Sequence, residues 1–100
     1  MRRNQFVVSA ESVQGNAGAE VTFRKITVGE RDRYLEDPKY GDLAAVRDHL
    51  VDWKGIVDDE GHELPSPKDE PGVDAALYLD EVGALARLLF QGPDDISSKN

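Results

Sequence analysis

The stretch QFVVSAESVQGNAGAEVTFRKI, residues 5–26, separates an α+β fold from a purely helical one. Its apolar residues recur at every second position, as Phe6, Val8, Ala10, Val21 and Phe23. This period of two predicts strands over residues 5–13 and 19–26. Turn-forming residues occupy positions 14–18 between them, so the two strands are predicted to pair as a β-hairpin.

Capping signals and apolar spacing predict two helices after this hairpin. Thr27-Val28-Gly29-Glu30 matches the capping box, in which hydroxyl and carboxylate groups satisfy the backbone N–H groups at a helix start. That short helix must end before Pro38. A second helix is predicted from Asp42, since the apolar residues that follow recur at spacings of three and four and end at Gly55. Its apolar stripe consists of Leu43, Val46, Leu50 and Trp53.

The rest of the chain is predicted to form a small hairpin, a linker and a final helix. Ile56-Val57 and His62-Glu63-Leu64 flank a charged tip, which is typical of a tight hairpin. Residues 65–74 contain prolines and a glycine and are interpreted as a linker. The final helix is predicted from about Asp74 to Phe90, where Gly92-Pro93 stops it.

These elements predict an α+β fold: an N-terminal β-hairpin, then a small helical domain of about three helices with a short second hairpin. A chain of 100 residues can bury one modest core. Residues 1–93 are therefore predicted to form a single domain, with residues 1–20 as its N-terminal strand region. Residues 94–100 have little apolar content and are predicted to be a mobile C-terminal tail.

Composition restricts the class of partner. The chain has no cysteine, so it can form neither a disulfide framework nor a thiolate site. Its formal net charge of −8 opposes binding to nucleic acid or to anionic membranes. Met1-Arg2-Arg3-Asn4 resembles a basic leader, but the apolar run behind it is too short for a signal peptide or a membrane span. We expect a cytoplasmic protein.

Side chains capable of chemistry are present but are not arranged for it. The densest cluster consists of Asp58, Asp59, Glu60, His62 and Glu63. Its spacing differs from an EF-hand loop, and neighbouring residues of a hairpin point to opposite faces, so a solvated turn is the better interpretation than a metal site. His49 belongs to no recognisable nucleophile motif and is interpreted as a packed residue. We expect no catalytic residues, no cofactor and no metal.

Apolar residues of the second and final helices are the candidates for binding. Trp53 continues an apolar stripe and is predicted to be a core residue, with an interface anchor as the alternative. On the final helix, the core-facing side is predicted to carry Tyr78, Val82, Leu85 and Leu89. Leu77, Ala84 and Leu88 fall on nearly the opposite side, and they are predicted to bind a partner or a second copy.

The order of these signals resembles the small tail assembly chaperones of long-tailed bacteriophages and prophages. The most telling stretch is DWKGIVDDEGHELP, residues 52–65, which is similar to the family's recurrent tryptophan, glycine, short acidic turn with glycine, and proline. Supporting it are VTFRKITVGE at residues 21–30 and the closing Ser98-Lys99-Asn100. In place of the family's usual polar helix start, this chain has Pro67-Lys68-Asp69-Glu70-Pro71-Gly72.

The resemblance implies a non-enzymatic phage tail assembly chaperone. Such a protein would act in the cytoplasm of the bacterial host, bind the tape measure protein and bring tail tube subunits to it, and be missing from the mature virion. An acidic partner with an apolar helical stripe suits this role, because tape measure proteins are long and rich in apolar helix.

Two other functions remain open at this stage. A structural tail or head-tail component could use its hairpins for strand pairing around a ring and stay in the virion. A small acidic inhibitor that imitates nucleic acid would need its acids on one face. Here basic residues lie among the acids, at Arg24, Lys25, Arg31, Arg33 and Arg47.

Overall fold

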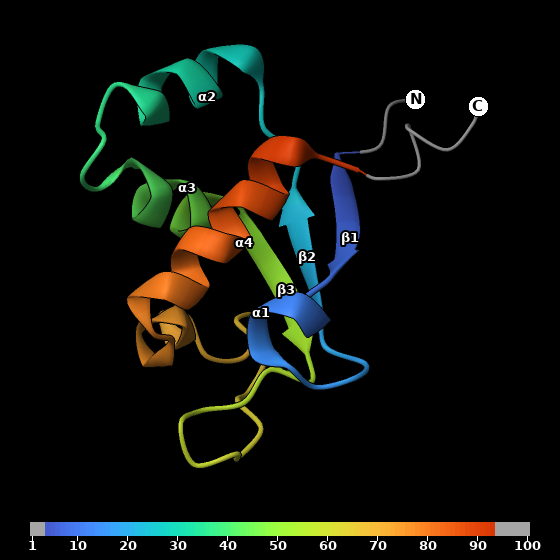
Figure 1. The fold of residues 1–100 in the computed structure, drawn as a ribbon. Helices are drawn as coiled ribbons and strands as arrows, with labels where there is room; N and C mark the ends of the chain where they lie inside the picture. The colour runs from blue at the N-terminus through green and yellow to red at the C-terminus, as the bar shows by residue number, and fades with distance from the viewer. Residues whose placement is uncertain (1–3, 94–100) are drawn as a thin grey trace.

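The computed structural model describes residues 4–93, in which helices pack on one face of a three-stranded antiparallel sheet (Figure 1). The strands are β1 (Gln5–Ser9), β2 (Glu20–Arg24) and β3 (Leu50–Lys54), in the spatial order β1-β2-β3. The helices are α1 (Glu11–Gln14), α2 (Val28–Leu35), α3 (Gly41–His49) and α4 (Leu79–Gln91), with a 3-10 turn η1 (Val73–Ala76). The predicted α+β class is confirmed. The predicted mobile tail at 94–100 lies outside the described residues.

The N-terminal hairpin is confirmed, but its first strand is shorter than predicted. β1 pairs with β2 in register from Gln5↔Arg24 to Ser9↔Glu20. The expectation of a strand through residue 13 is wrong, because the chain leaves the sheet at Ala10 and forms α1. The Ser9 hydroxyl accepts the Glu11 N–H at 3.2 Å, a local bond that competes with the sheet ladder.

The second predicted helix ends earlier than its apolar stripe indicates. α3 stops at His49, and the chain continues as β3, so the assignment of Leu50 and Trp53 to a helix is wrong. β3 pairs with β2, with Trp53 opposite Val21. The backbone N–H and C=O groups on the second edge of β2 need hydrogen-bond partners, and the backbone of β3 supplies them. The spacing of Leu50 and Trp53 also suits a helix, so apolar spacing alone could not distinguish the two structures.

Helix α2 begins as its capping box predicts. The Thr27 hydroxyl accepts the Glu30 N–H at 3.1 Å, and the Glu30 carboxylate accepts the Thr27 N–H at 2.9 Å. The helix ends at Leu35, before the proline. Gly41 then allows α3 to start directly against α2, since a Cβ at this position would collide with the Tyr34 carbonyl.

The second hairpin is confirmed as a small bridged turn. Val57 pairs with Glu63, and the Leu64 N–H donates to the Ile56 carbonyl at 2.7 Å. Gly61 turns the tip with φ 86°, a left-handed conformation that favours glycine. The hairpin follows β3 directly and lies beside the sheet end (Figure 1).

The final helix starts later than predicted. Residues 73–76 form η1, the chain extends at Leu77 and Tyr78, and α4 begins at Leu79. The predicted start at Asp74 is wrong because the buried Asp74 accepts the Arg47 Nε–H at 2.9 Å, which ties η1 to α3. The predicted stop is confirmed, since Gly92 follows α4 with φ 81°.

One cluster of buried apolar side chains lies between the sheet and α4, which crosses one sheet face in Figure 1. It draws on every strand and on α3 and α4, and its larger members are Phe6, Val8, Val21, Phe23, Val46, Trp53, Ile56, Val82, Leu85 and Leu89. On β1 and β2 only alternate residues enter it, and the residues between them lie on the opposite face of the sheet, which no described helix covers. Within residues 4–93 no helix has the length and apolar character to span a bilayer.

Candidate partner-binding surface

Helix α4 presents the core face that its spacing predicts, with one exception. Val82, Leu85 and Leu89 are buried against the sheet. Tyr78 is exposed, so its predicted core position is wrong. It precedes the first helical residue, and its extended backbone takes it off the helical face. Its N–H donates to the Glu81 carboxylate at 2.8 Å and caps the helix.

The structure places the predicted partner-binding residues Leu77, Ala84 and Leu88 at intermediate exposure. Leu77 lies before α4, so it does not share a helical face with the other two. Ala84 and Leu88 remain one turn apart, on the flank that also carries Glu81. Gln14 of α1 donates to the Glu81 carboxylate at 2.9 Å, so α1 lies beside that flank.

The large apolar side chains that the structure leaves exposed lie elsewhere. In fractional exposure they are Val7 57%, Val28 67%, Leu35 59%, Tyr40 56%, Tyr78 58% and Leu79 82%. Val28 and Leu35 are two turns apart on α2 and therefore share one face of that helix. We call Val28 and Leu35 the α2 surface.

None of the eight residues of helix α2 is buried. Its attachment is made mainly by Tyr34, whose hydroxyl donates to the Asp48 carboxylate of α3 at 2.7 Å. The Tyr34 ring also meets the buried His49 ring edge-on, with centroids 5.8 Å apart. The inner side of α2 is thus held by polar and aromatic contacts, and its apolar residues point outward.

His49 is a packed residue, as predicted. It is fully buried, and its Nδ1 lies 2.9 Å from the Arg24 carbonyl, which can only accept a hydrogen bond. Nδ1 therefore carries the proton, and Nε2 faces the Arg24 guanidinium at 3.4 Å. The ring joins α3 to the end of β2 and offers no open nitrogen to a substrate.

The attachment of α2 should respond to alkaline pH. Burial, and then the hydrogen bond to Asp48, raises the pKa of Tyr34 to about 12 from its ordinary 10.0. The folded state retains this proton longer than the unfolded state, so the stabilisation is complete below pH 10 and is lost as pH rises towards 12. Absorbance titration at 295 nm should show a late-ionising phenol that Tyr34→Phe removes. If the phenol that Tyr34→Phe removes ionises near pH 10, the prediction is wrong.

In the acidic turn after β3, the Asp58 carboxylate accepts hydrogen bonds from backbone N–H groups of the same turn. One oxygen of Asp58 accepts the N–H groups of Glu60 and His62, each at 2.9 Å. These bonds hold the pKa of Asp58 below its ordinary value, the His62 N–H making the largest contribution. Among residues 4–93 no three acidic or histidine side chains are grouped as metal ligands.

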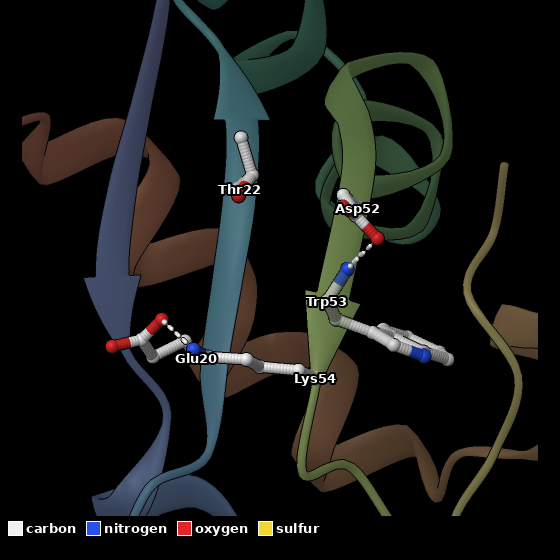
Figure 2. A pocket seen from close by; sticks show the side chains of 5 residues that line it. All are labelled: Glu20, Thr22, Asp52, Trp53 and Lys54. Atoms are coloured by element: carbon white, nitrogen blue, oxygen red, sulfur yellow. Dashed lines mark hydrogen bonds and ion pairs between the residues drawn. The ribbon is translucent and has the colours of Figure 1, made fainter.

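A shallow depression lies on the uncovered face of the sheet (Figure 2). Its lining consists of Glu20, Thr22, Asp52, Trp53 and Lys54. The charged groups are engaged: Lys54 Nζ is 3.5 Å from Glu20 Oε1, and Asp52 accepts the Trp53 N–H at 2.8 Å. The Ser66 hydroxyl also donates to Asp52 at 2.6 Å, which lowers the pKa of that carboxyl. Because these charged groups already bond one another or the backbone, we interpret the depression as an ordinary part of the sheet surface.

The stretch that carries the family resemblance, residues 52–65, forms a folded unit. Trp53 is buried, and its indole Nε1–H donates to the Pro65 carbonyl at 2.8 Å, which closes the unit at both ends. Gly55 has φ 72°, and a Cβ there would approach the Ala19 backbone at 3.1 Å. Gly61 turns the tip. The tryptophan, glycines and proline of this stretch therefore have structural roles.

No protein-family model, curated protein or solved structure matches this chain. Functional inference consequently depends on the residues themselves and on the surfaces that the fold leaves exposed.

Proposed function

We propose that this protein is a non-enzymatic chaperone of phage tail assembly, which binds an apolar helical segment of the tape measure protein on its α2 surface. Support comes from the resemblance of residues 52–65 to that family and from the exposed apolar residues of α2. The exposure of Val28 and Leu35 on one helical face is the observation that carries the proposal.

Helix α2 has the features of a binding element. Eight residues are too few for a helix to be stable by propensity alone, and α2 buries none of its residues in the core. Two features position it: the capping box at its N-terminus, and Tyr34, which bonds α3. Neither uses Val28 or Leu35. A partner helix with an apolar stripe could pack on Val28 and Leu35 and gain the burial that this domain does not provide.

The charge of the chain suits the same role. A net charge of −8 on 100 residues keeps a complex with an apolar partner dispersed. Between Val28 and Leu35, on the same face, the helix exposes Arg31 and Asp32, which are paired at 3.3 Å and would make polar contacts within the binding face. The proposal includes action in the host cytoplasm, delivery of tail tube subunits and departure before the virion is complete.

Co-expression with a tape measure fragment tests the binding surface. Leu35→Glu should sharply reduce the soluble fraction of the fragment, because it replaces one of the two apolar side chains of the α2 surface with a carboxylate. Leu79→Glu is the matched control, since it makes the same change at an even more exposed leucine outside that surface. Both variants should melt close to the parent, because neither leucine is in the core.

Other outcomes would locate the interface elsewhere or reject the function. Loss of solubility with Leu88→Glu but not with Leu35→Glu would move the interface to the α4 flank. Unchanged solubility with all three variants would contradict binding by either surface. Mass spectrometry of purified particles should find the protein missing, whereas multiple copies per particle would identify a structural subunit.

A further inference from the structure

The two edges of the sheet differ, and the outer edge of β1 is open. The Ala10 N–H donates to the Ala19 carbonyl, and the Lys25 N–H donates to the Asn4 carbonyl. Successive residues of an antiparallel strand direct their backbone N–H and C=O groups alternately to one side and the other. These two bonds therefore show that Phe6 and Val8 bond β2, while the backbone groups of Gln5, Val7 and Ser9 point outward. Among residues 4–93 none pairs with this outer edge.

The outer edge of β3 is closed by side chains and by the following segment. The Trp53 N–H, which points outward there, donates to the Asp52 carboxylate at 2.8 Å. Asp52 also accepts from Ser66, and the Trp53 indole donates to Pro65, so the chain around residues 65–66 lies along this edge. Figure 2 shows the indole on the side of β3 that faces away from β2.

We propose that β1 is a self-association edge, at which a second copy of this chain adds its own β1 antiparallel and continues the sheet. The three outward-facing residues are centred on Val7, so a two-fold axis there pairs Val7 with its own copy and Gln5 with Ser9. All of their N–H and C=O groups then find partners. Because only one edge of the sheet is left open by residues 4–93, the pairing closes at a dimer and does not continue as a ring or filament.

The lack of charge on β1 allows a second copy to pair at this edge. Asn4 to Ala10 carries no charge, although 32% of the chain is charged. β1 also lacks the proline, lysine or bulge with which sheet edges commonly avoid pairing. Across the two-fold axis the residues that face each other directly, Gln5 and Ser9, are both uncharged, so no like charges oppose the pairing. On the uncovered face the exposed Val7 meets its own copy, which favours pairing.

Cross-linking tests this geometry directly, because the chain has no cysteine of its own. Val7→Cys should form a disulfide-linked dimer on mild oxidation, since its Cα would lie about 5.5 Å from its copy. Thr22→Cys is the control: it is the register partner of Val7 on the same face, but its copy would be roughly 14 Å away. Equal cross-linking of both variants, or of neither, would overturn the proposal.

Sedimentation equilibrium of the full chain supplies the second measurement. The parent should approach twice its monomer mass as concentration rises, and Val7→Lys should weaken the dimer about fivefold or more by placing like charges opposite each other. Thr22→Lys makes the same change one strand further in and should have a smaller effect. A parent that is monomeric at every concentration overturns the proposal, as does equal weakening by both lysine variants. Neither measurement depends on tape measure binding.

Discussion

Replacing Trp53 with alanine is expected to lower the free energy of unfolding by about 3–5 kcal/mol. The side chain is buried in the core, opposite Val21 on the neighbouring strand, and its removal would leave a cavity at the sheet edge. It also holds Pro65 through the indole N–H. Since small domains are stable by about 5–15 kcal/mol, this loss is a large fraction of the total, and the melting temperature of the variant should fall far below that of the parent.

Circular dichroism should be used for the measurement, because Trp53 is the only tryptophan and fluorescence is lost with it. Trp53→Phe is the matched variant: it keeps an aromatic ring but lacks the N–H, and it should cost about 1–3 kcal/mol. An alanine variant that melts with the parent and loses only partner binding would show that Trp53 acts as a surface anchor.

Leu85→Glu should have a comparable or larger effect and unfold the domain. Leu85 is among the largest fully buried side chains and lies on the core face of α4. A carboxylate there would have no described cationic partner, so the expected loss is more than about 4 kcal/mol. The melting transition followed by circular dichroism should be absent or shifted far below that of the parent.

Leu88→Glu is the matched control, one residue before Leu89 on the half-buried flank of the same helix. Its carboxylate can reach water, so we expect a loss of about 1–2 kcal/mol and a folded protein. If Leu88→Glu unfolds the protein as completely as Leu85→Glu, then the flank beside α1 is part of the core. Ala84 and Leu88 would then have to be abandoned as partner-binding residues.

Local sequence determined the features whose causes are local. The Thr27–Glu30 capping box and the glycine at the end of α4 each depend on a few adjacent residues. The core face of α4 was also predictable, because Val82, Leu85 and Leu89 recur at the helical period, and all three are buried. The α+β class followed from these same patterns.

Tertiary structure alone decided the features that depend on distant partners. Residues 50–54 are a strand because β2 offers them backbone hydrogen bonds, although Leu50 and Trp53 also fit a helical stripe. The α4 flank is half covered because Gln14, far away in sequence, bonds Glu81. The packing of the core also decides which apolar residues stay exposed. It leaves Val28 and Leu35 exposed on α2, and it leaves the edge of β1 at Val7 open. Apolar periodicity identifies residues that can be buried, but only the packing of the whole chain determines which of them remain available to a partner.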